Sequence, residues 1–217
     1  MRISTVIKAL LAVTAATPLI CHAESNLQNG AGALTATAHV DFTITIPKFL
    51  FLRVGNGTGA INAAGVFTVG NAPATNGAID VITFAPTPAQ VGTGAMAGTG
   101  GDLTGGVETA IVVANNGTVT LTSTTGGTLN DGAAGDTISW SQIQTAATHN
   151  NTVVTLPAPT LLDSGNGSVT ITPASGKVVA EDAKWTYTYL NATVPPAGTY
   201  GGAGVNNGRV TYTASLP

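Results

Sequence analysis

Charged residues, aromatic residues and cysteine are all scarce in this sequence. Of the 217 residues, 8% are charged and 5% are aromatic, and Cys21 is the only cysteine. A single cysteine excludes an internal disulfide, so core packing and sheet pairing must provide the stability. No segment reaches the run of about 20 apolar residues that a membrane-spanning helix needs, which argues against a transmembrane segment.

The first 23 residues have the composition of a secretory signal peptide. A basic start is followed by the short apolar run Ala9 to Ile20 and by the small residue Ala23. This order predicts export, with cleavage after Ala23. A lipidated Cys21 is the less favoured alternative, because Ile20 occupies a position where a lipidation signal prefers a small residue.

Without these residues the chain has five basic and ten acidic side chains, a net charge of −5 with histidine neutral. The basic residues form no cluster, which argues against nucleic acid or an anionic membrane as the partner. Residues 24–33 are polar and contain glycine, and they are expected to form a flexible N-terminal extension.

The segment Leu34–Ile46 has the most regular pattern in the chain. Every even-numbered position in it is apolar and every odd-numbered position is polar. This period of two predicts a β-strand with one dry and one wet face. Thirteen residues would span about 43 Å, roughly twice the length of a common strand. Such a strand either bends between two sheets or is offered to a neighbouring molecule.

Phe49–Val54 is apolar on both faces and fits a strand buried between two layers. Further short strands are predicted along the rest of the chain, because apolar and polar residues alternate between turns rich in Gly, Asn and Pro. The predicted strands are Phe49–Val54, Gly65–Val69, Ala78–Phe84, Thr109–Ala114, Thr118–Ser123, Thr137–Ile143, Thr152–Leu156, Ser168–Thr172, Lys184–Leu190 and Arg209–Leu216. The stretch Ile138–Ala147 also fits a short helix. The pattern favours an all-β, antiparallel sandwich formed by residues 34–217 as a single domain, with a closed barrel as the lesser option.

The sequence shows no catalytic arrangement. Nucleophilic catalysis needs a nucleophile and an oriented base, and only His39 and His149 carry imidazoles beyond the first 23 residues. Each is interpreted as a surface residue, His39 on the polar face of the long strand and His149 in a turn. No group of residues has the spacing of a zinc site. We therefore expect neither enzymatic activity nor a cofactor.

Calcium has one candidate loop, Asn130–Asp136. Asp131 and Asp136 set carboxylate oxygens, which hard cations prefer, in a glycine-containing loop. The loop lacks the alternating acidic positions and the final Glu of a known calcium loop, so a plain turn is favoured and calcium binding stays open.

Two aromatic features remain. Trp185, Tyr187 and Tyr189 share one face of a predicted strand, where they form either an exposed platform for sugar rings or the bulk of the core. The inward alternative is favoured because the chain has few other large residues to fill a core. Gly198-Thr199-Tyr200 has the form of a tyrosine corner, in which the hydroxyl bonds back to the backbone, and this supports an immunoglobulin-like sandwich.

Several of these features together resemble a fimbrial subunit of the chaperone–usher type. They are the signal peptide, the long alternating N-terminal strand, the β domain rich in Thr, Gly, Ala and Asn, and the last strand that follows a Gly-x-Tyr corner. In that family each subunit is an immunoglobulin-like sandwich without its final strand, and the N-terminal extension of the next subunit fills the groove by β-augmentation.

The resemblance implies roles for both ends of this chain. The acceptor groove would be lined by Val210, Tyr212, Ala214 and Leu216. The donor side chains would be Leu34, Ala36, Ala38, Val40, Phe42 and Ile44. Gly204 stands where many such subunits have a glycine, whereas Leu216 replaces an aromatic residue that is frequent there, and the disulfide of many members is missing. The implied partners are other copies of the chain, a periplasmic chaperone and an outer-membrane usher.

Two functional hypotheses follow. In the first, the protein is a non-catalytic structural subunit of a surface fimbria or pilus, exported through the periplasm and polymerised by donor-strand exchange. In the second, it is a self-complete secreted sandwich that binds glycan or a surface through its loops and the aromatic residues of one strand, as an adhesin does. A secreted hydrolase is a weaker third option, which would need acidic residues converging in one cleft.

Overall fold

The computed structural model describes residues 25–57, 59–68, 79–132 and 135–217. The chain divides into two units, residues 1–46 and residues 47–217. The predicted signal peptide lies outside the described residues. The compact unit thus begins at Pro47, and not at Leu34 as the sequence pattern suggested.

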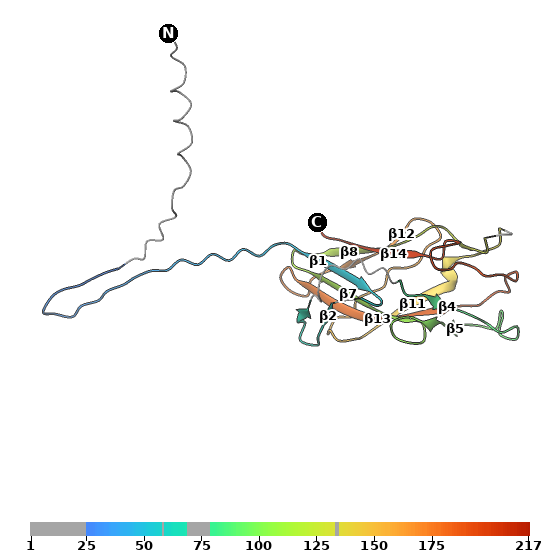
Figure 1. The fold of residues 1–217 in the computed structure, drawn as a ribbon, viewed down its shortest axis with the longest axis horizontal. Coiled ribbons are helices and arrows are strands. Elements are labelled where there is room, and N and C mark those ends of the chain that lie inside the picture. Colours follow the sequence, from blue (N-terminus) through green and yellow to red (C-terminus); the bar gives the residue numbers. More distant parts are fainter. Residues whose placement is uncertain (1–24, 58, 69–78, 133–134) are drawn as a thin grey trace, which may run out of the picture. The chain divides into compact units, whose positions relative to one another are not determined.

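Residues 25–46 contain no strand (Figure 1), and every one of them is exposed in the single chain. The prediction of a strand at Leu34–Ile46 is therefore wrong for the single chain. Val40, Phe42 and Ile44 are 74%, 87% and 85% exposed. A strand needs a neighbouring backbone to satisfy its N–H and C=O groups, and sequence periodicity alone does not supply that partner.

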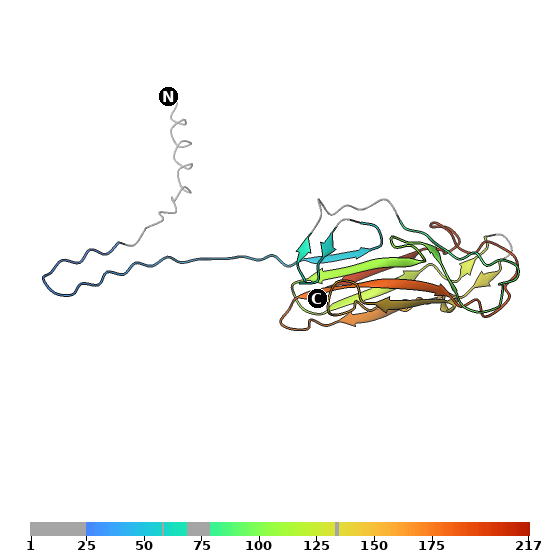
Figure 2. The same cartoon turned by 90° about the horizontal axis from the view of Figure 1, so that it is seen from below.

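Residues 47–217 form a nearly all-β unit, as predicted from the alternation and the turns. The strands are β1 (Leu50–Val54), β2 (Ala60–Ile61), β3 (Phe67–Thr68), β4 (Ile82–Thr83), β5 (Met96–Ala97), β6 (Thr99–Gly100), β7 (Val107–Ala114), β8 (Val119–Thr125), β9 (Leu129–Asn130), β10 (Thr137–Ile138), β11 (Ile143–Thr148), β12 (Asn166–Ile171), β13 (Val179–Tyr189) and β14 (Val210–Ser215). Helix among the described residues is limited to the 3-10 turn η1 (Trp140–Gln142), so the proposed short helix over Ile138–Ala147 does not form. The long strands lie lengthwise beside one another (Figure 2).

Two antiparallel sheets make up the sandwich. One has the strand order β1-β7-β13-β11, with β5 pairing to the end of β13, and the other has the order β12-β8-β14. Three small ladders, β2–β3, β4–β6 and β9–β10, complete the pairing among the described strands. Strand β1 is therefore an edge of the first sheet and β14 an edge of the second.

The alternation in the sequence accounts for the way these strands bury their side chains. In β8, Val119, Leu121 and Ser123 are buried, and the residues between them are partly or fully exposed. In β7 nearly every residue is buried, because this central strand is covered on both faces. Its even-numbered residues face the main core, and Ile111 and Val113 pack in a second cluster with Ile61 of β2.

One side of the sandwich is closed by the chain itself. The segment 152–162 connects β11 to β12, the edges of the two sheets on that side, and places Leu156 and Leu161 in the main core with exposures of 0% and 3%. The Trp185 indole N–H donates to Leu156 O at 3.0 Å, and Ser123 Oγ donates to Thr160 O at 2.8 Å. The predicted strand Thr152–Leu156 is instead part of this closing segment.

Candidate functional site: a groove between the first and last strands

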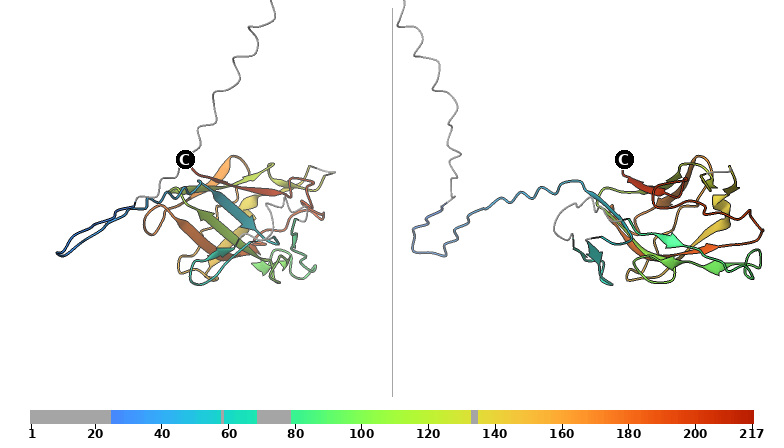
Figure 3. Two further views of the ribbon diagram at one scale, coloured as in Figure 1. Left: turned by 60° about the vertical axis from the view of Figure 1, so that its left-hand side comes forward. Right: turned by 45° about the vertical axis from the view of Figure 1, so that its right-hand side comes forward.

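The opposite side of the sandwich is open. Strands β1 and β14 lie next to each other there (Figures 1 and 3), yet among the described residues each is paired with a strand on one side alone, β1 with β7 and β14 with β8. Each strand thus presents an unpaired backbone edge toward the space between them, and an unpaired edge is a template for another strand.

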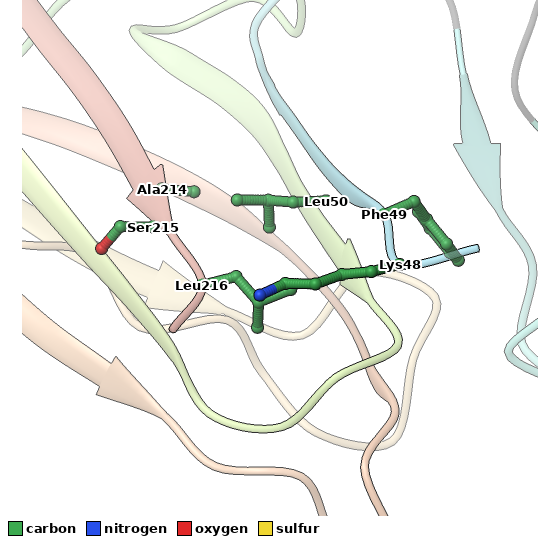
Figure 4. A pocket seen from close by; sticks show the side chains of 6 residues that line it. All are labelled: Lys48, Phe49, Leu50, Ala214, Ser215 and Leu216. Atoms are coloured by element: carbon green, nitrogen blue, oxygen red, sulfur yellow. The ribbon is translucent and has the colours of Figure 1, made fainter.

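Two adjoining cavities occupy this space. The first, of about 530 Å³, is lined by Lys48, Phe49, Leu50, Ala214, Ser215 and Leu216. The second, of about 320 Å³, is lined by Leu52, Val54, Ile79, Arg209, Val210, Thr211 and Tyr212. We call the two cavities together the β1–β14 groove. In Figure 4 the side chains of Leu50 and Ala214 point toward each other between the strands, and Phe49 points away.

The groove is apolar because of the alternation in β14. Val210, Tyr212, Ala214 and Leu216 are half-buried and pack against the main core, and the residues between them are exposed. Leu52 and Val54 of β1 pack against the same core from the facing sheet. The groove is thus an opening into the sandwich interior, on the side where no segment comparable to 152–162 covers the core among the described residues.

All four residues that the resemblance assigns to an acceptor groove line this opening. Gly204 does not line it. The sequence interpretation missed the other wall, since Leu50, Leu52 and Val54 were expected in a strand buried between two layers. The run Phe49–Val54 is apolar on both faces, and this signal does not distinguish an edge strand from a central one.

Tyr212 is held rigidly at the groove. Its hydroxyl lies 2.8 Å from the Tyr187 hydroxyl, and its ring centroid lies 5.2 Å from that of Trp185. Burial raises the pKa of Tyr212 to about 12, the nearby Glu108 carboxylate adds to this, and the hydrogen bond with Tyr187 opposes it. This phenol therefore stays neutral near neutral pH, and Tyr212 forms part of the groove wall.

The aromatic residues of β13 lie inside the sandwich. Trp185, Tyr187 and Tyr189 are 0%, 6% and 7% exposed. The alternative in which these three rings form an exposed platform for sugar stacking is therefore wrong. The alternative in which they point into the protein describes their placement. Trp185 and Tyr187 belong to the main core, which their large rings help to fill, and the Tyr189 ring packs against that of Phe84 with centroids 5.9 Å apart.

Glu108 is an interior carboxyl close to the groove. It lies on β7 with 5% exposure, and Asp102 N–H donates to its Oε2 at 3.2 Å. Burial raises the pKa of Glu108 to about 7, the hydrogen bond from the Asp102 backbone opposes this, and the negative charges of Asp80 and Asp102 raise it further. Nothing in the residue pattern distinguished Glu108 from a solvated acid.

The predicted tyrosine corner is present. The Tyr200 hydroxyl donates to Pro196 O at 2.7 Å. This bond stabilises the turn that leads toward β14, the strand that forms one wall of the groove.

The candidate metal-binding and imidazole residues do not come together in the part of the chain that the structure describes. No group of three or more His, Cys, Asp or Glu side chains there could hold a metal ion. His39 and His149 are both exposed. In the candidate calcium loop, Asp131 N–H donates to Asp136 O at 3.2 Å, as in a turn, and residues 133–134 lie outside the described range. No described helix is long and apolar enough to span a bilayer.

Comparison with protein-family models, curated proteins and solved structures gives no match for this chain.

Proposed function

We propose that this protein is a non-catalytic structural subunit of a surface fimbria, assembled by donor-strand exchange. In this proposal the sandwich is immunoglobulin-like and lacks one strand, and the β1–β14 groove accepts residues 34–46 of a second copy. The chain is exported, and a periplasmic chaperone and an outer-membrane usher handle it before assembly. The observation that carries the proposal is the open apolar groove between two unpaired strand edges.

The donor segment fits the chemistry of this groove. Its apolar residues recur at every second position, the spacing at which a strand seated between β1 and β14 would direct side chains into the core. Its backbone would pair with both edges once these separate, because some Cα atoms of β1 and β14 lie within 8 Å of each other and a strand between them needs about 9.5 Å. Val40, Phe42 and Ile44 are largely exposed in the single chain, so their burial in another copy would be driven by the hydrophobic effect.

Paired substitutions on the two faces of the donor segment test the proposal. A chain that begins at Glu24 is expected to form fibres visible by electron microscopy and large species in size-exclusion chromatography. Phe42→Asp is expected to leave a folded monomer, because Phe42 is 87% exposed and outside the sandwich. Thr43→Asp places the same charge on the polar face and is expected to assemble as the wild type does.

The outcomes separate the two functional hypotheses. Fibres formed by Phe42→Asp as readily as by the wild type would show that assembly does not use this apolar face. A wild-type chain that stays monomeric at every concentration and fails to bind a peptide of residues 33–46 would instead support a self-complete secreted sandwich.

A further inference from the structure

Two carboxylates, those of Asp80 and Glu108, lie around Gly55 at one end of the groove, and Asp102 lies beside Glu108. A side chain on Gly55, which has a φ of 77°, would collide with Asp80 Oδ2 and would lie 2.8 Å from Glu108 Oε2. The chain therefore comes close to both carboxylates where β1 ends, and only glycine permits this approach.

Asp80 and Asp102 are each held by donors suited to a carboxylate. Asp80 accepts from Asn56 N–H at 2.6 Å and from Asn56 Nδ2 at 2.9 Å. Asp102 accepts from Thr109 N–H at 2.8 Å and from the Thr109 hydroxyl, and the Arg53 guanidinium donates to that hydroxyl oxygen at 2.7 Å. Glu108 accepts a hydrogen bond of 3.2 Å from Asp102 N–H, longer than the backbone bonds to Asp80 and Asp102. Its carboxylate faces those of Asp80 and Asp102 from the interior.

This cluster is joined to the groove by neighbouring residues. Val54, which lines the groove, precedes Gly55, and Ile79, which also lines it, precedes Asp80. Tyr212 lines the groove as well and lies within electrostatic range of Glu108. A negative charge on Glu108 would repel Asp80 and so disturb the segment that holds Ile79 against the groove.

On the basis of the proposed function, we infer that Glu108 is a proton-binding group that couples strand insertion to pH. A strand seated between β1 and β14 excludes water from the interior beside Glu108, and an apolar, dry environment disfavours the ionised carboxylate. The strand therefore binds more tightly to the form that carries a proton on Glu108, and insertion in mildly alkaline solution requires uptake of a proton from solvent. Assembly is accordingly favoured below neutral pH.

The other ionisable groups that face Glu108 do not share this role. Burial raises the pKa of the Tyr187 hydroxyl well above 10 and that of Tyr212 to about 12, so both stay neutral in the relevant range. Asp80 and Asp102 accept the hydrogen bonds from Asn56 and Thr109 described above. Arg209 also lines the groove.

Peptide binding as a function of pH tests the inference on the full chain. The acceptor is the Phe42→Asp chain, whose groove is unaltered, and the probe is a fluorescent peptide of residues 33–46. The peptide carries His39→Asn, because imidazole changes charge in the same pH range. Fluorescence anisotropy is expected to show a dissociation constant about fivefold or more larger at about pH 8.5 than at about pH 6. With Glu108→Gln added to the acceptor, the constants at the two pH values should agree within about twofold.

Asp80→Asn is the second acceptor variant, for use if Glu108→Gln fails to fold. It removes one of the two charges that repel an ionised Glu108, so the loss of affinity should be smaller than in the parent chain. Peptide binding that does not change with pH in the parent chain, or that weakens equally in Glu108→Gln, overturns the inference and leaves the proposed function intact. Absence of binding at every pH overturns both.

Discussion

Asp182 shows how a single buried carboxylate organises the closed side of the sandwich. It has 0% exposure and accepts hydrogen bonds from Thr152 N–H and Thr152 Oγ1, both at 2.7 Å, and from Asn150 Nδ2 at 2.7 Å. Asn151 adds bonds from its backbone N–H and its side chain. These donors fix the turn that begins the segment 152–162.

Asp182→Asn is expected to lower the free energy of unfolding at neutral pH by about 1–3 kcal/mol, because an amide cannot accept all of these bonds. Burial alone would raise the pKa of Asp182, but the bonds from Thr152, Asn151 and Asn150 outweigh it and lower the pKa below 3.8. Because the pKa of Asp182 is lower in the folded than in the unfolded state, the ionised carboxylate stabilises the fold at pH values above the unfolded-state pKa. This stabilisation is lost as the pH falls through the folded-state pKa. Urea unfolding of the monomeric Phe42→Asp chain, with and without Asp182→Asn, should therefore show that the Asp182 variant loses less stability on acidification.

Asp41→Asn is the matched control, since Asp41 lies in the exposed extension. Its unfolding curve should superimpose on that of the wild type. Equal stability of Asp182→Asn and the wild type at neutral pH would contradict the structural role given to Asp182.

At the scale of elements, alternation in the sequence correctly indicated the strands with a partner nearby and failed where the partner was missing. The predicted strands at Thr109–Ala114, Thr118–Ser123, Ser168–Thr172 and Arg209–Leu216 correspond to β7, β8, β12 and β14. The stretch Leu34–Ile46 has the clearest alternation of all and forms no strand in the single chain. Periodicity reports which faces of a segment are apolar, whereas pairing depends on a second backbone.

The groove could be predicted in part for the same reason. Its β14 wall followed from the alternation near the C-terminus together with the family resemblance. The β1 wall and Glu108 could not be predicted, because edge position and burial of a charged group depend on contacts between residues far apart in the sequence. The closing segment 152–162 could not be predicted either. A strand was expected at Thr152–Leu156, but Thr155 makes only an isolated bridge to Asp182.

The closed and open sides should respond differently to truncation of a leucine. Leu156→Ala is expected to destabilise the monomer by about 2–5 kcal/mol, because its side chain is fully buried and leaves a cavity. Leu216→Ala, at the half-buried groove, should cost about 1 kcal/mol or less in the monomer, since water already reaches this position. Guanidinium unfolding of the Phe42→Asp chain carrying each substitution measures both. The reverse order of effects would mean that the groove is as well packed as the closed side.

Across the whole molecule, the folded sandwich and the segment proposed to complete it in another copy belong to different units of the chain. Residues 47–217 contain all the described strands and both apolar clusters, and residues 25–46 contain an exposed apolar face. Under the proposed function, a molecule arranged in this way has one sheet edge left to pair. Its stability should therefore increase when that edge is paired.

Thermal unfolding of the Phe42→Asp chain with added peptide of residues 33–46 measures this increase. A ligand that binds only the folded state stabilises it by about 2.7 kcal/mol at a free concentration of 100 times Kd. For a unit of this size, each kcal/mol raises Tm by about 2–4 °C, so a rise of about 5–11 °C is expected. A peptide with Val40→Asp and Ile44→Asp should leave Tm unchanged, because its apolar face is interrupted, whereas Thr37→Ser and Thr43→Ser on the polar face should preserve the full rise. An equal rise with the charged peptide would show that the groove does not select for the alternating apolar side chains.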